Sequence, residues 1–151
     1  MDNLLREQIA KMRQSFFDEG TLDSHYFAQL EQLEGPDNPN FVEEIITLFF
    51  RESTKMLATM ETNLREKCPV NFIGINKMLN QIKVNSASIG AIRIKEQVIP
   101  MLNNLKENNL EGAKASFQGL KVEYDTLKRK LEPYFQLQRQ AGPVETAVPP
   151  K

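Results

Sequence analysis

The sequence has few of the residues that many catalytic and metal-binding sites require. Its 151 residues include one cysteine, one histidine and no tryptophan. A single cysteine, Cys68, cannot form an internal disulfide, so disulfide-stabilised secreted scaffolds are excluded and a reducing compartment fits the composition. Because His25 is the single histidine, a zinc or iron site with two or more imidazole ligands is also excluded. We therefore expect no metal ion and no cofactor.

Charge and hydropathy argue against two further classes of protein. The chain has 19 lysines and arginines against 20 aspartates and glutamates, a net charge of −1. A general nucleic-acid binder would show a basic excess, so we expect no nucleic-acid partner. No stretch approaches about 18 consecutive apolar residues, and the N-terminal segment mixes charged residues into every turn. The sequence therefore predicts neither a membrane-spanning helix nor a signal peptide.

Apolar residues recur at helical spacing along most of the chain. The spacing predicts a first helix ending at Gly20, a short second helix from about Asp23, and helices over about 40–67, 71–88, 92–108 and from 110 onward. No segment shows the two-residue alternation of a strand. The expected fold is all-α, an antiparallel four-helix bundle with two additional N-terminal helices. One domain is expected over residues 1–140, with the proline-rich residues 141–151 as a disordered tail.

Single residues indicate where these helices begin and end. Asp23 and Asn71 are placed to cap the second and fourth helices, and Gly90 marks the end of the fourth. For the third helix we expect Asn38 to be the cap and Pro39 to occupy the first helical position.

The apolar faces and internal prolines of the later helices give further expectations. The third helix should bury a stripe of Val42, Ile45, Phe49, Met56, Met60 and Leu64. Further apolar residues widen its face beyond what one neighbouring helix needs: Phe41, Ile46, Leu48 and Phe50. The fourth should bury Ile75, Met78, Leu79, Ile82 and Ile89. The last helix has a heptad-like seam of Ala113, Phe117, Leu120, Tyr124, Leu127, Leu131 and Tyr134. Pro100 should kink the fifth helix, and Pro133 should bend or fray the last one.

The common catalytic motifs are missing. The sequence contains no GxGxxG, Walker loop, HExxH or CxxC, and its carboxylates are spread among lysines over helix faces. His25, between Ser24 and Tyr26, is interpreted as a structural residue, with a phosphoacceptor or acid–base role as the alternative. Cys68, just before Pro69, is interpreted as an ordinary loop cysteine and not as a redox group.

One stretch differs from a generic bundle surface. It reads NQIKVNSASIGA from Asn80 to Ala91, in the fourth predicted helix and just beyond its end. At 100° per residue, the positions opposite the core form a small and weakly basic face: Lys77, Asn80, Lys83, Val84 and Ala87.

This stretch resembles the phosphoacceptor helix of plant histidine-containing phosphotransfer (HPt) proteins. Active members carry a sequence like HQLKGSSxxIGA there, and this chain keeps Gln81, Lys83, Ser86, Ser88, Ile89, Gly90 and Ala91. The segment FVEEIITLFFRES, from Phe41 to Ser53, resembles the family's third helix, and residues 124–131 resemble its last. The resemblance covers about residues 1–140 and implies the HPt fold.

The resemblance places Asn80 where the family has its phosphoacceptor histidine. A neutral imidazole nitrogen has a lone pair free to attack a phosphoryl group, whereas the lone pair of the Asn80 carboxamide nitrogen is delocalised into the carbonyl. Asn80 can therefore occupy a partner's pocket without accepting the group. Val84 replaces a glycine of the family one turn later, and Asn85 replaces a serine.

The resemblance thus implies a pseudo-HPt, a binding protein and not an enzyme. Its expected partners are the receiver domains of hybrid histidine kinases and response regulators, and its expected effect is to dampen a multistep His–Asp phosphorelay of the cytokinin type. No catalytic residue is expected, and the expected receiver-binding residues are Lys77, Asn80, Gln81, Lys83, Val84, Ser86 and Ala87. The apolar face of the second and third helices would add contact area.

Two alternatives stay open at this point. The chain could transfer phosphoryl groups through another residue such as His25, or it could be a scaffold-only bundle in which Val84 blocks receiver docking. We expect a monomer, and the family resemblance implies a cytoplasmic and nuclear location.

Overall fold

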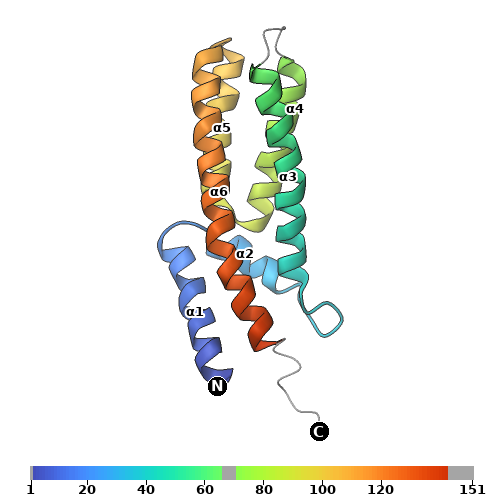
Figure 1. The fold of residues 1–151 in the computed structure, drawn as a ribbon, viewed down its shortest axis with the longest axis vertical. Coiled ribbons are helices and arrows are strands. Elements are labelled where there is room, and N and C mark those ends of the chain that lie inside the picture. Colours follow the sequence, from blue (N-terminus) through green and yellow to red (C-terminus); the bar gives the residue numbers. More distant parts are fainter. Residues whose placement is uncertain (1, 66–70, 143–151) are drawn as a thin grey trace.

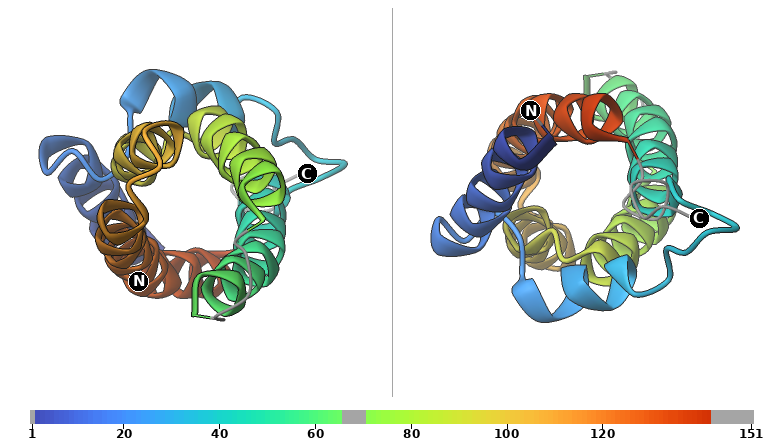
Figure 2. Two further views of the ribbon diagram at one scale, coloured as in Figure 1. Left: turned by 90° about the horizontal axis from the view of Figure 1, so that it is seen from above. Right: turned by 90° about the horizontal axis from the view of Figure 1, so that it is seen from below.

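The computed structural model describes residues 2–65 and 71–142. It contains helices α1 (Asp2–Asp18), α2 (Ser24–Glu31), α3 (Phe41–Arg65), α4 (Phe72–Ile89), α5 (Ile92–Lys106) and α6 (Leu110–Ala141). Helices α3 to α6 form an antiparallel bundle (Figure 1), which appears as a ring in the end-on views (Figure 2). Helix α1 packs along the C-terminal half of α6, and α2 packs against α3 and α4. The all-α prediction is confirmed.

The heptad-like seam of α6 lies in the core as predicted. All seven of its predicted residues are buried: Ala113, Phe117, Leu120, Tyr124, Leu127, Leu131 and Tyr134. They join one continuous apolar core that reaches from α1 and α2 to the far end of the bundle. Tyr134 contacts Phe16 of α1 and Phe27 of α2 edge to face, which fixes the two N-terminal helices on α6.

The apolar face of α3 is wide, as predicted, but the residues buried in it differ in part from the predicted stripe. Ile45 and Met56 are only half-buried, whereas Ile46, Phe50 and Leu57 are buried beside the correctly predicted Val42, Phe49, Met60 and Leu64. The reason is that α3 packs against α4 on one side and α6 on the other, so its buried arc is wider than the stripe that one neighbour would require. Met78 of α4 is likewise half-buried, at the edge of its helix's core face.

The start of α3 also differs from the prediction. The helix begins at Phe41, so Pro39 lies before it, and the Asn38 side chain donates to the carbonyl of Leu33 at 3.1 Å instead of capping the helix. The backbone N–H of Val42 donates to Oε2 of Glu34 at 3.0 Å. A carboxylate from the preceding turn therefore satisfies a free N–H of the first helical turn.

Helix α6 does not end near Pro133. It continues to Ala141, with Pro133 on its exposed side and the neighbouring Tyr134 and Phe135 buried. The carbonyl of Ala141 accepts from the guanidinium of Arg6 at 3.2 Å, so α1 helps to hold this end. The predicted domain boundary at residue 140 falls inside the last turn of α6. The rest of the predicted tail, residues 143–151, and Cys68 lie outside the described residues.

Helix α5 also contains a proline. It continues through Pro100, which lies on its exposed side, and the kink there stays a prediction.

Candidate functional site

Helix α4 presents the candidate site because its ends are fixed and one face is buried. Asn71 caps the N-terminus, its Oδ1 accepting from the N–H of Gly74 at 2.9 Å, as predicted. The residues on the core side are all buried: Ile75, Leu79, Ile82, Ser86 and Ile89. The opposite side of the helix carries the residues singled out from the sequence.

Gly90 ends α4 and joins it to α2. Its φ of +81° is in the left-handed region, and a Cβ there would lie 3.0 Å from the carbonyl oxygen of Asp23. The N–H of Asp23 donates to the Gly90 carbonyl at 2.8 Å, and Asp23 also caps α2 by accepting from Tyr26. Ile89 and Ala91 on either side are buried. The IGA sequence therefore serves to set α2 against the end of α4.

Asn80 lies on the exposed side of α4. Its Nδ2 donates to the carbonyl of Asn76 at 2.9 Å, one turn earlier on the same helix. Its neighbour Gln81 is exposed and donates to Oδ1 of Asn85 at 3.0 Å. The amides are thus held along the helix surface, where they offer hydrogen-bonding groups to a partner but no nucleophilic nitrogen.

Two lysines give this face a positive charge. Lys77 is exposed and Lys83 is half-buried. Within residues 2–65 and 71–142, neither ammonium group forms an ion pair with a carboxylate. Their charge is therefore available to an acidic partner.

The apolar and small residues of the face divide into two groups. The side chain of Val84 is 61% exposed, and Ala87 is half-buried on the same side. Ser86 is 0% exposed, and its Oγ donates to the carbonyl of Ile82 at 2.6 Å. The expectation that Ser86 contacts a partner is therefore wrong, because position 86 lies on the core side of α4.

The face borders a groove whose second wall could not be predicted from the sequence. A groove of about 910 Å³ is lined by Lys77, Asn80, Gln81 and Val84 of α4 together with Leu102, Asn103, Leu105 and Lys106 of α5. Only the antiparallel pairing of α4 with α5 brings these α5 residues beside Asn80. One signal in the sequence could have indicated this groove: Ile73 is an apolar residue at an outward position of α4. In the structure it is 84% exposed.

His25 lies in a different part of the molecule. It is exposed on α2, where its ring contacts Tyr26 edge to face and lies 3.3 Å from Nε2 of Gln29. Helix α2 meets α4 at Gly90, which is roughly 15 Å along the helix axis from Asn80. His25 is therefore not part of the Asn80 face.

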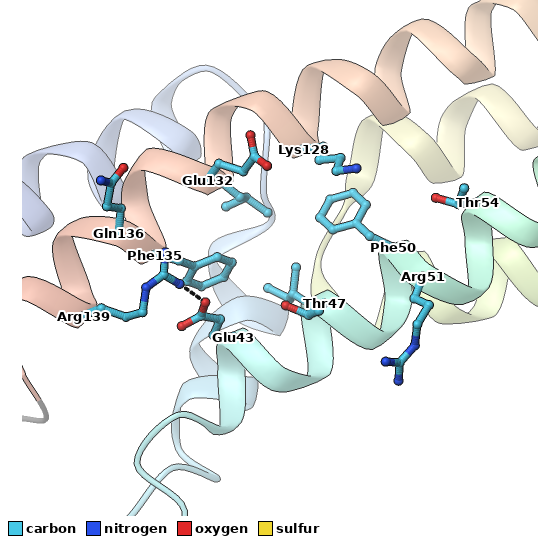
Figure 3. Close-up of a pocket in the computed structure, with 12 residues that line it drawn as sticks. Glu43, Thr47, Phe50, Arg51, Thr54, Lys128, Glu132, Phe135, Gln136 and Arg139 are labelled. Carbon is cyan, nitrogen blue, oxygen red and sulfur yellow. Dashed lines mark hydrogen bonds and ion pairs between the residues drawn. The ribbon is translucent and has the colours of Figure 1, made fainter.

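A second groove, of about 660 Å³, separates the lower halves of α3 and α6 (Figure 3). Its floor includes the buried Phe50 and Phe135, and an ion pair between Glu43 and Arg139 crosses it. The remaining charges along its walls, Arg51, Lys128 and Glu132, are of mixed sign. This arrangement joins the two helices and contains no paired nucleophile and base.

The described part of the chain offers no metal site or membrane helix. No group of three or more histidine, cysteine, aspartate or glutamate side chains there is placed to hold a metal ion. None of the helices within the described ranges is long and apolar enough to cross a bilayer.

Comparisons with known proteins identify relatives over nearly the whole chain, although no family model matches it. Pseudo histidine-containing phosphotransfer protein 2 of rice (Oryza sativa subsp. japonica) is 44% identical over 144 residues, covering 95% of this chain and 94% of the rice protein. Histidine-containing phosphotransfer protein 1 of Arabidopsis thaliana is 36% identical over 135 residues, covering 89% of this chain and 86% of that protein. The relatives thus include proteins named with and without the prefix "pseudo".

Solved structures match the fold. A histidine-containing phosphotransfer protein from Medicago truncatula superposes with a TM-score of 0.83 at 36% sequence identity, covering 97% of this chain and 96% of that one. The corresponding structure from maize gives a TM-score of 0.84 at 27% identity, covering 91% of this chain and 99% of the maize chain.

Proposed function

This chain belongs to the family of histidine-containing phosphotransfer proteins of His–Asp phosphorelays, and we propose that it is a pseudo form, which binds receiver domains without accepting a phosphoryl group. Members of the family are relay shuttles and not classical enzymes. A member that occupies receivers without passing the phosphoryl group on would compete with active members and dampen a multistep relay of the cytokinin type.

The observation that carries the proposal is Asn80 on the outward face of α4. The sequence resemblance implies that it stands at the phosphoacceptor position. Its carboxamide is exposed, and its nitrogen donates a hydrogen bond to the carbonyl of Asn76. Phosphoryl transfer would require the P–O bond of a receiver's aspartyl phosphate to break while a P–N bond forms to an imidazole nitrogen. A carboxamide nitrogen has no free lone pair for that bond, so docking at Asn80 ends without transfer.

The surface around Asn80 is suited to a receiver. Lys77 and Lys83 supply positive charge for the acidic pocket of such a domain, while Gln81, Val84 and Ala87 surround the position. Additional apolar contact area is available on α2 and α3, where Tyr26 and Leu48 are 47% and 42% exposed. A cytoplasmic and nuclear location and a monomeric state form part of the same proposal.

Incubation with a receiver domain phosphorylated on its aspartate tests the proposal. We expect the wild-type chain to bind the receiver and to acquire no acid-labile, alkali-stable phosphate. Asn80→His restores an imidazole at the outward position and is the matched gain-of-function variant, expected to become labelled. Labelling of the wild-type chain would overturn the proposal.

The alternative that His25 is the phosphoacceptor needs its own variant. His25→Ala removes the single imidazole of the chain but leaves the α4 face unchanged. If the wild type were labelled and His25→Ala were not, the chain would be a phosphotransfer protein that uses α2. We expect both proteins to stay unlabelled and to bind receivers equally.

A further inference from the structure

The groove beside Asn80 has an uneven distribution of charge. Lys77 of α4 and Lys106 of α5 line it, and none of its lining residues is acidic. Among the described residues, no carboxylate forms an ion pair with either lysine. The groove on the other side of α4, between α3 and α4, is smaller at about 190 Å³ and is lined by the carboxylate of Glu52. Acidic side chains of a partner are therefore favoured on the α5 side.

Exposed apolar side chains follow the same groove. Ile73 and Val84 lie on the outward side of α4, one on each side of Asn80. Ile73 is 84% exposed and Val84 is 61% exposed. The half-buried Leu102 adds apolar surface on the α5 wall, next to the exposed amide of Asn103. Apolar residues at the centre with polar and charged residues at the edge are typical of a protein–protein contact.

We propose that a receiver domain bound over Asn80 also contacts α5, and that it places acidic side chains near Lys106 and apolar side chains against Leu102 and Val84. The inference rests on the proposed function and adds α5 to the interface. Lys106 also lies in the last turn of α5, where its positive charge interacts favourably with the helix dipole and stabilises the helix. An experiment must therefore separate partner binding from helix stability.

Titration of a receiver domain against charge variants of the full chain provides this separation. Lys106→Glu is expected to weaken binding about fivefold to tenfold at low salt, and the loss is expected to shrink as salt rises. Lys106→Gln should show a smaller loss, and Lys106→Arg should bind like the wild type. The matched control is Lys95→Glu, an exposed position on the same helix that lines neither groove and should leave the affinity unchanged.

Two further readouts make the outcome decisive. Thermal unfolding monitored by circular dichroism should show that the Lys106 variants remain folded. In ¹⁵N-labelled chain, the backbone amide signals of Asn103 and Lys106 should shift on receiver addition, while that of Lys95 should not.

Three results would overturn the inference. If the wild type binds a receiver while Lys106→Glu binds equally well and the α5 amides do not shift, α5 is outside the interface and only the proposed function survives. If no receiver binds the wild type, both fail together. The third result is that the groove pairs two copies of the chain. The mass measured by sedimentation would then rise with protein concentration, Lys106→Glu would abolish this rise, and receiver binding would be unaffected by the variant.

Discussion

The backbone N–H of Asp23 donates a hydrogen bond of 2.8 Å to the carbonyl oxygen of Gly90 and thereby joins the start of α2 to the end of α4. This bond depends on a close approach of the two backbones at a residue with positive φ. It sets the relative position of the two helices that carry His25 and Asn80.

Gly90→Ala should destabilise the protein. The added Cβ would be strained by the φ of +81° and would lie 3.0 Å from the Asp23 carbonyl oxygen. We expect a loss of about 1–3 kcal/mol in the free energy of unfolding, measured by urea titration. The matched control is Gly35→Ala, since a Cβ at Gly35 meets nothing closer than 3.7 Å. Equal stability of the two variants would contradict the role assigned to Gly90.

Val84 decides between receiver binding and the scaffold-only alternative. If Val84 is a contact, Val84→Ala removes apolar area and should weaken receiver binding by about 1 kcal/mol in titration calorimetry. Alanine is used first because it retains the helix, and Val84→Gly then tests the replacement of the family's glycine. Tighter binding by the glycine variant would instead locate a steric block at this position. No binding by any of the three proteins would favour the scaffold-only alternative.

Tyr124 joins α6 to α3 in the core. Its hydroxyl donates to the backbone carbonyl of Phe50 and accepts from the hydroxyl of Thr54. Tyr124→Phe keeps the ring but removes both bonds, so we expect a loss of about 1–2 kcal/mol in unfolding free energy. The exposed Tyr26 offers the control substitution Tyr26→Phe, which should change stability by less than about 0.5 kcal/mol.

Stability should fall at alkaline pH. Burial raises the pKa of the Tyr134 phenol well above its usual range, and nearby Glu31 adds to the shift. Above about pH 10 the unfolded chain therefore releases this proton while the folded chain retains it, so the stabilisation present at lower pH is lost as pH rises. Urea unfolding between about pH 8 and pH 11 should show this decline, and Tyr134→Phe should reduce its slope. If Tyr134→Phe leaves the slope of unfolding free energy against pH unchanged, the decline does not come from Tyr134.

Features that depend on local sequence were predictable. The seam of α6 follows from the spacing of its apolar residues, which places them on one face of any straight helix. The caps Asp23 and Asn71 follow from side chains that reach a backbone N–H within their own turn.

Features that depend on packing between distant segments were not predictable in the same way. The widened apolar face of α3 indicated a second neighbouring helix. Periodicity alone did not show that Leu57 is buried while Ile45 and Met56 are only half-buried, because that depends on how α4 and α6 pack on α3. Glu34 replaces Asn38 at the start of α3 because its carboxylate reaches Val42 across a turn.

The sequence by itself determined that α4 bears no histidine and that its outward face carries Asn80, because residue identity and helical period settle both. The tertiary structure decided which of the neighbouring residues a partner can reach. It brought Leu102 and Lys106 of α5 beside Asn80. The physical reason is that burial and antiparallel packing depend on contacts between segments far apart in the chain, which no local pattern specifies.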